Sequence, residues 1–320
     1  MLTFHKLDDI PRDFGPALVS VGNFDGVHRA HRHVIDEIVR RSKAGNARSV
    51  VVTFEPHPAR ILRPDQNFKL LTPLREKLRL LETTGVDAVL LLPFSRDLSL
   101  MTPHQFADEI LKQGLHAREV HEGYNFHFGH KAAGNIQLLR ELGKEKEMGF
   151  EVHDYPEMRL RGEPVSSSHI RKLLSEGRVR RARHLLARPF SILSTPGRGR
   201  GYGSKYTVPT INLAHYEELV PKDGVYITRT RVGDECFDSV TNVGNRPTFG
   251  SDSFAIESHL LNFHPLELSA ETEVELYFLD RVRDEIKFPS VEALRAQIGL
   301  DVAKAQKYLR RLARGTRITP

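Results

Sequence analysis

The sequence predicts an α/β protein of two domains. We expect a doubly wound parallel sheet in residues 1–186, followed in residues 187–320 by an antiparallel β-barrel that ends in a helix. Three observations predict this class. The first half alternates continuous apolar runs with amphipathic stretches, the second half has short alternating runs between glycine, proline and charged turns, and the 320 residues suffice for two domains.

The first half is a strand and helix alternation. Its strand-like runs are apolar throughout, which is typical of parallel strands covered by helices on both faces. We expect strands in residues 17–24, 48–58, 86–94 and 117–126. We expect helices in residues 31–45, 74–85, 102–114 and 134–145.

The second half begins after a stretch with helical spacing, residues 171–189, that ends at Pro189. Beyond it, alternating apolar and polar residues predict an antiparallel sheet or barrel. We expect its strands in residues 224–232, 237–243, 254–261 and 272–279. The tail, residues 290–315, predicts a helix that breaks near Gly299.

Composition narrows the partners. The formal net charge is +6, which favours anions, whether nucleic acid, membrane lipid or small phosphorylated ligands. Zero tryptophan argues against stacking on single strands, and no apolar tract is long enough to cross a bilayer, so we expect neither nucleic acid nor membrane as partner. The single cysteine, Cys236, and an N-terminus without a signal-peptide pattern predict a cytoplasmic protein. The sequence does not determine the oligomeric state.

The stretch "VGNFDGVHRAH", residues 21–31, predicts a phosphate site between a strand and a helix. Gly22 and Gly26 allow backbone amides to approach a ligand, and a helix that begins near His31 presents free N–H groups. His28 and His31 are three residues apart and can donate to one phosphate. Asp25 is expected to anchor the loop rather than bind metal. The alternatives are an ordinary turn with two exposed histidines, or a zinc site drawn from His28, His31, His33 and His57.

Other stretches extend this site. Residues 54–58 ("FEPHP") and 123–129 ("GYNFHFG") also lie at the carboxyl ends of expected strands. We therefore expect these strand ends to converge on one cleft. In "VSSSHIR", residues 165–171, hydroxyls at a helix start with an arginine one turn later predict an anion site, or else an ordinary helix cap. The glycine-rich basic run of residues 197–213 suits a lid over phosphates or a mobile linker.

The motifs together resemble a known family. "GNFDGVHRAH" looks like the GxFDxxHxGH signature of nucleotidyltransferases, and "FEPHP", "GYNFHFGHKAAGN" and "VSSSHIRKLLSEG" follow in the order and spacing of the bacterial bifunctional riboflavin kinase/FAD synthetase family. In the second half, "VPTINL" resembles the PTxN motif of riboflavin kinases, with "GVY", "NVGNRPTF" and "IESHLLNF" after it. The resemblance implies a Rossmann-like nucleotidyltransferase domain before a riboflavin kinase barrel, with riboflavin, FMN and ATP as substrates.

The resemblance also implies residue roles. His28 and His31 would stabilise the ATP α-phosphate while the FMN phosphate attacks it and pyrophosphate leaves. Thr210 and Asn212 would hold Mg²⁺ and phosphates, and Glu257 would be the general base of the kinase. Nucleotide binding would fall to Gly22, Phe24, Gly26, Asn125, Ser166, Ser167, Arg171, Gly201, Gly203, Lys205, Thr210 and Asn212. Flavin binding would fall to His57, Asn125 and His127.

Two departures leave alternatives open. Ala30 stands where the family has a glycine between the histidines, and His127 stands where an arginine is often found. The chain could therefore be a riboflavin kinase with a weakened synthetase domain, or a nucleotidyltransferase for another phosphorylated acceptor. A non-enzymatic alternative is a basic protein that binds nucleic acid through residues 178–183 and 307–317.

Overall fold

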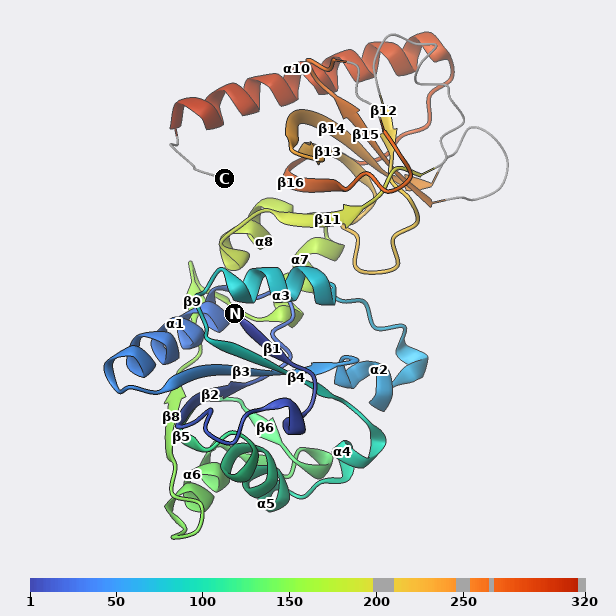
Figure 1. The fold of residues 1–320 in the computed structure, drawn as a ribbon. Helices are drawn as coiled ribbons and strands as arrows, with labels where there is room; N and C mark the ends of the chain where they lie inside the picture. The colour runs from blue at the N-terminus through green and yellow to red at the C-terminus, as the bar shows by residue number, and fades with distance from the viewer. Residues whose placement is uncertain (198–209, 246–253, 265–267, 316–320) are drawn as a thin grey trace. The chain divides into compact units, whose positions relative to one another are not determined.

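The structure is a computed structural model that describes residues 1–197, 210–245, 254–264 and 268–315, and it divides into two units, Met1–Ser167 and Ser168–Pro320 (Figure 1). The predicted α/β class, with a parallel sheet first and an antiparallel sheet second, is confirmed. No helix in the described part of the chain is long and apolar enough to cross a membrane.

The first unit is built on a parallel sheet with the strand order β1-β4-β3-β2-β5-β8. Its strands are β1 (Leu2–Phe4), β2 (Ala17–Val21), β3 (Arg48–Glu55), β4 (Ala88–Pro93), β5 (Ala117–Gly123) and β8 (Glu151–Tyr155). Short antiparallel pairs are β6 (His127–Phe128) with β7 (Gly134–Asn135), and β9 (Arg159–Leu160) with β10 (Glu163–Pro164). Because β2 to β4 step one way from the middle and β5 and β8 lie on the other side, the direction of winding reverses between β2 and β5.

Helices cover both faces of this sheet (Figure 1). They are α1 (Arg29–Ala44), α2 (Pro58–Leu62), α3 (Leu74–Glu82), α4 (Arg96–Leu100), α5 (Pro103–Gln105), the π-helix η3 (Phe106–Gly114) and α6 (Ile136–Lys144), with 3₁₀ turns at Leu7–Asp9, Pro64–Gln66 and His130–Ala132. One apolar core lies under α1 and α3, and a second lies under η3 and α6 on the opposite face. The continuous apolar strands are therefore buried on both sides, as the sequence predicts.

The second unit holds an antiparallel sheet with the order β11-β16-β13-β14-β15-β12. Its elements are α7 (Ser167–Ser175), α8 (Val179–Leu186), β11 (Phe190–Ser194), β12 (Thr210–Asn212), β13 (Gly224–Val232), β14 (Glu235–Asn245), β15 (Phe254–Leu260), β16 (Val274–Arg283) and α10 (Val291–Gly315). The two edge strands meet through a bridge between Pro196 and Leu213, which closes the sheet into a barrel.

The barrel interior holds a buried group of hydroxyls among apolar side chains, and an apolar patch lies on the outer face. Thr228, Thr230, Ser239, Thr241 and Ser258 are fully buried and hydrogen-bond to one another at 2.7–3.1 Å, so their hydroxyls satisfy each other. The alternate residues of β13 and β14 face outward, where α10 covers them with Ala305 and Leu309. The C-terminal helix is therefore packed on the barrel wall.

Three predicted helix boundaries are wrong. The first helix begins at Arg29 rather than near His31, because His28 caps it. Residues 171–189 form two helices rather than one, since Gly177 takes a left-handed φ of 75° between α7 and α8. The C-terminal helix does not break at Gly299, because a glycine in a helix costs only about 1 kcal/mol and the packing of α10 exceeds it.

Candidate active sites

The first candidate site lies where β2 and β5 separate. These strands pair as far as Val19 and Val120, and beyond that point they diverge. The amide of Val21 then donates to the Glu122 carboxyl group at 2.5 Å instead of to the neighbouring strand. Burial raises the pKa of Glu122 well above its usual value. The carboxyl ends of β3, β2 and β5 lie side by side here, which is where open α/β sheets bind ligands.

The side chain of Asp25 fixes the loop between β2 and α1, to which this residue belongs, to a neighbouring segment. Its carboxylate is buried and accepts hydrogen bonds from the amides of Leu71 and Thr72, both at 3.0 Å. Gly26 has a φ of +89°, which favours glycine, and Val27 has a φ of +38°, which is strained for a β-branched residue. The predicted anchoring role of Asp25 is confirmed, and strain is concentrated in the predicted phosphate loop.

His28 has a structural task that also fixes its tautomer. Its Nδ1 accepts a hydrogen bond from the amide of His31 at 3.3 Å, which caps α1. The ring proton therefore lies on Nε2, which is a donor. The rings of His28 and His31 stack with centroids 3.6 Å apart. The structure thus brings the two predicted histidines together at the N-terminus of a helix, where an anion is stabilised.

His31 stays uncharged in this environment. Desolvation by burial lowers its pKa well below the usual value, and the charge of Lys77 adds to the shift. Its Nδ1 is buried and has no hydrogen-bond partner among the residues that the structure describes. A buried polar atom without a partner carries a free-energy cost that a ligand would remove.

Lys77 is a functional candidate that the sequence analysis missed. Its side chain is buried, and Nζ donates to Thr53 Oγ1 at 3.1 Å and to the Asn23 carbonyl at 3.4 Å. Burial lowers its pKa, while Glu55 and Asp25 oppose the shift. The amphipathic spacing of α3 gives no sign that its single lysine turns inward toward the ends of β2 and β3.

The remaining predicted residues of the first unit border the same strand ends. His57 is buried, caps α2 by accepting from the amide of Ala59 at 3.1 Å, and stacks on Phe68. Asn125 and His127 are exposed after β5, where His127 Nδ1 lies 2.9 Å from the Asn125 carbonyl. Their roles toward nucleotide and flavin stay predictions.

Phe24 and Gly22 are placed differently from each other. The Phe24 ring is buried in the core under α1, 5.0 Å from the ring of His31. A Cβ at Gly22 would approach that ring to 3.2 Å, so the glycine makes room for the phenylalanine, and its predicted role toward a nucleotide stays a prediction.

The serine-rich motif reaches the phosphate loop. Ser167 Oγ donates to the carbonyl of Asp25 at 2.8 Å, and Ser166 precedes it in the chain. Arg171 lies on α7 in the second unit. Ala30 lies in the first turn of α1 and does not interrupt it. Ligand atoms from His28, His31, His33 and His57 do not gather in threes within the described residues, so the zinc alternative has no support.

The second candidate site is a row of polar side chains across three strands. Glu257 of β15 pairs with Asn212 of β12 on one side and with Asn242 of β14 on the other. Thr210 pairs with His259, and Thr210 Oγ1 lies 3.5 Å from His259 Nδ1. Because directly opposed residues share a face of an antiparallel sheet, Thr210, Asn212 and Glu257 all lie on one face.

Glu285 adds a second carboxylate that the sequence analysis missed. Its Oε1 accepts a hydrogen bond from Asn242 Nδ2 at 3.2 Å, and a Cβ at Gly244 would overlap the Glu285 carboxylate. Burial lowers the pKa of His259, the neighbour of Thr210. The face therefore brings several side-chain oxygen atoms together beside the His259 imidazole. Gly201, Gly203 and Lys205 lie outside the described residues.

Comparisons with known proteins cover both units. Residues 10–169 match the family described as FAD synthetase, and residues 186–309 match the family described as riboflavin kinase. A "bifunctional riboflavin kinase/FMN adenylyltransferase" of Buchnera aphidicola subsp. Schizaphis graminum is 32% identical over 91% of this chain and 93% of its own length. The protein of that name from Escherichia coli (strain K12) is 30% identical over 95% of this chain and 96% of its own. A crystal structure described as a macrolide-efflux protein from Streptococcus pneumoniae is similar with a TM-score of 0.84 and 26% identity, over 95% of this chain and 98% of that one.

Proposed function

The chain belongs to the family of bifunctional riboflavin kinases/FMN adenylyltransferases, and from this premise we propose which residues carry out its two reactions. One unit transfers a phosphoryl group from ATP to riboflavin and yields FMN. The other transfers an adenylyl group from a second ATP to FMN and yields FAD and pyrophosphate. We assign adenylyl transfer to residues 1–186 and phosphorylation to residues 187–320.

Adenylyl transfer is supported by the two stacked histidines at the start of α1. An oxygen of the FMN phosphate attacks the α-phosphorus of ATP, and the bond to the β-phosphate oxygen breaks. Nε2–H of His28 is held in place as a donor to the α-phosphate, because Nδ1 is occupied by the helix cap. His31 and Lys77 add hydrogen-bond donors, and Lys77 and the N-terminus of α1 add positive potential, where negative charge increases. Catalysis is then positioning and electrostatic stabilisation.

Binding of the remaining phosphates is assigned to the serine-rich motif. Ser167 is tied to the carbonyl of Asp25, so its neighbour Ser166 lies beside the phosphate loop. We propose that Ser166, Ser167 and Arg171 receive the β- and γ-phosphates. His57, Asn125 and His127 are proposed to bind the flavin phosphate end. His127 is an imidazole in place of a fixed positive charge, so we expect weaker binding of FMN rather than loss of the reaction.

Riboflavin phosphorylation is supported by the shared face of Thr210, Asn212 and Glu257. The Glu257 carboxylate accepts the proton of the ribityl 5′-hydroxyl while that oxygen attacks the γ-phosphorus, and ADP leaves. The neutral oxygens of Thr210 and Asn212 are suitable ligands for Mg²⁺. Two protein ligands leave the other coordination positions of the ion to phosphates and water. The ion, when bound, neutralises charge on the transferred phosphoryl group. Gly201, Gly203 and Lys205 are proposed to bind the nucleotide.

Separate assays of the two reactions test this assignment. With FMN, ATP and Mg²⁺, we expect Glu257→Gln to form FAD at the wild-type rate, and His28→Asn to be slower by about 100-fold or more. With riboflavin in place of FMN, and with FMN formation as the measured rate, we expect Glu257→Gln to be the slow variant and His28→Asn to react at the wild-type rate. Failure of wild type to form FAD from FMN would leave a riboflavin kinase with a weakened synthetase. A product other than FAD with another phosphorylated acceptor would favour a different nucleotidyltransferase.

We also propose the binding partners and the cellular location of the protein. The substrates riboflavin, FMN and ATP follow from the family. Arg178, Arg180 and Arg181 are exposed, and Arg178 and Arg180 lie within 4.0 Å of Glu176 and Asp280. A basic face with acidic neighbours is a weak site for nucleic acid, so we propose no nucleic-acid or membrane partner, and a cytoplasmic location.

A further inference from the structure

A group of polar side chains on β5 and β8 has no part in either proposed reaction. Glu119 and His121 are alternate residues of β5, and His153 of β8 is the cross-strand partner of His121. They face α1, whose Arg41 also reaches them. Glu119 and His121 are buried, and the side chain of His153 is 32% exposed. The group therefore lies beneath a helix but is open on one side.

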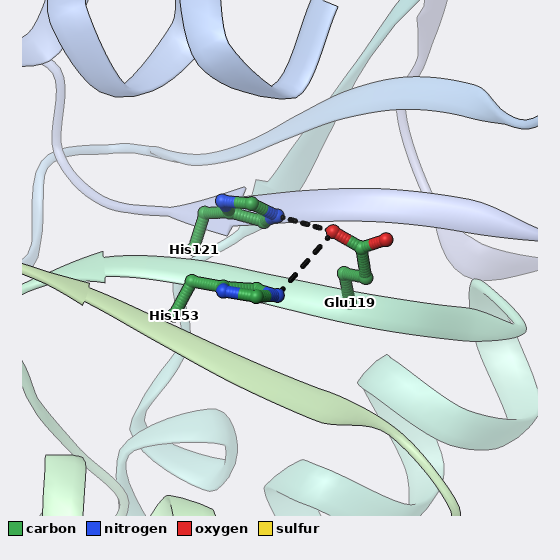
Figure 2. A group of neighbouring side chains, drawn as sticks. All are labelled: Glu119, His121 and His153. Carbon is green, nitrogen blue, oxygen red and sulfur yellow. Dashed lines mark hydrogen bonds and ion pairs between the residues drawn. The ribbon is translucent and has the colours of Figure 1, made fainter. Parts of the chain in front are cut away.

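Three atoms of this group that can bind a metal ion point toward one another (Figure 2). Glu119 Oε2 lies 3.0 Å from His121 Nε2 and 3.5 Å from His153 Nε2, and all three atoms lie within 4.8 Å of one another. The two imidazole rings stack at 4.6 Å between centroids with an angle of 24°, so both Nε2 atoms point the same way. Among the described residues, this is the one set of three such ligands.

We propose that Glu119 Oε2, His121 Nε2 and His153 Nε2 bind a divalent transition-metal ion, with Zn²⁺ as the preferred occupant. In a tetrahedral zinc site with bonds of about 2.0–2.1 Å, ligand atoms lie about 3.3 Å apart. The separations of 3.0 and 3.5 Å bracket that value. Two imidazoles and one carboxylate suit Zn²⁺ and disfavour Mg²⁺, and three protein ligands leave a fourth position for water.

Tyr155 provides the outer contact that metal-binding histidines usually have. Its hydroxyl lies 2.7 Å from His121 Nδ1, on the opposite side of the ring from Glu119. With Nε2 bound to metal, Nδ1–H donates to this hydroxyl, which fixes the tautomer and the ring orientation.

Arg41 is the competitor of the metal ion. Its Nε donates to the same oxygen, Glu119 Oε2, at 2.7 Å, and its side chain is one-third exposed. In the metal-free protein the guanidinium neutralises the buried carboxylate. Binding of the ion replaces this contact, and Arg41 turns toward solvent. Removal of Arg41 should therefore strengthen metal binding, whereas removal of a ligand should weaken it.

Occupancy would join the edge strand to the rest of the sheet. β8 is paired on one side, to β5, and a metal ion bound to His121 and His153 would add a second link between them. Because the ion binds the folded state, zinc should raise the melting temperature of the chain.

The test is a zinc titration of the full-length protein stripped of metal, in excess Mg²⁺, followed by calorimetry. We expect one equivalent to bind, and Co²⁺ in place of zinc to give the visible absorption of a tetrahedral nitrogen and oxygen site. His153→Gln should weaken zinc binding by more than about ten-fold, and Arg41→Met should tighten it by about ten-fold. Both positions are partly exposed, so neither change should prevent folding.

His104→Gln is the matched control. His104 Nε2 lies 3.5 Å from Glu145 Oε2, the same separation as between His153 and Glu119, but this pair is exposed and no third ligand joins it among the residues that the structure describes. The His104→Gln variant should bind zinc with the wild-type affinity. The proposal is wrong if wild type binds no equivalent of zinc, if His153→Gln and His104→Gln bind alike, or if Arg41→Met fails to bind more tightly than wild type.

Discussion

Replacement of Asp25 by alanine tests whether the phosphate loop is held by its buried carboxylate. The change removes the acceptor of two buried amides, those of Leu71 and Thr72, each 3.0 Å from an Asp25 oxygen. A hydrogen bond to a charged group contributes about 1.5–3 kcal/mol. Two such bonds give about 3–6 kcal/mol, and because water entering the vacated space restores part of this, we expect a loss of about 3 kcal/mol in the free energy of unfolding.

The measurement combines urea unfolding with amide hydrogen exchange of residues 68–74. Asp25→Ala should speed exchange at Leu71 and Thr72 and slow formation of FAD from FMN, while riboflavin phosphorylation stays unchanged. Asp36→Ala, an exposed aspartate of α1, is the control and should alter neither. The reasoning is refuted if Asp25→Ala unfolds within about 1 kcal/mol of wild type with unchanged exchange in this segment.

Three further predictions concern the histidines and the barrel. His28→Ala should lose about 1 kcal/mol of stability with the helix cap, whereas His28→Asn should keep the cap, and urea unfolding separates them. The lowered pKa of His31 means that the unfolded chain binds more protons below about pH 6.5, so stability should fall as pH drops below that value by up to about 1.4 kcal/mol per unit, a slope that thermal scans should find smaller in His31→Gln. Arg231→Met should cost about 3 kcal/mol in urea unfolding, because it leaves the fully buried Glu275 carboxylate without the guanidinium that now lies 2.8 Å away.

Much of the fold was predictable because its signals are local. Continuous apolar runs identified β2 to β5, and the loops that follow β2, β3 and β5 are indeed neighbours at one edge of the sheet. His28 and His31 could be paired from spacing alone. The helix boundaries were harder, because a cap by His28 and a left-handed turn at Gly177 depend on φ values that periodicity does not report.

The residues that were missed owe their position to tertiary contacts. Lys77 belongs to an amphipathic helix pattern, and its inward direction follows from the packing of α3 over β2 and β3. Glu122 and Glu285 stand in ordinary charged stretches, and their partners are about 101 and 43 residues away in sequence. His121 and His153 become neighbours through the register of β5 and β8, which a single sequence does not specify.

The central claim is that one chain carries two independent active sites, one for each reaction. A time course from riboflavin, ATP and Mg²⁺ tests it most directly, with FMN and FAD separated by chromatography. We expect wild type to form FMN and then FAD, His28→Asn to stop at FMN, and Glu257→Gln to form little of either. An equimolar mixture of the two variants should restore FAD. If the mixture does not form FAD, or if His28→Asn forms FAD like wild type, the assignment of the two sites is contradicted.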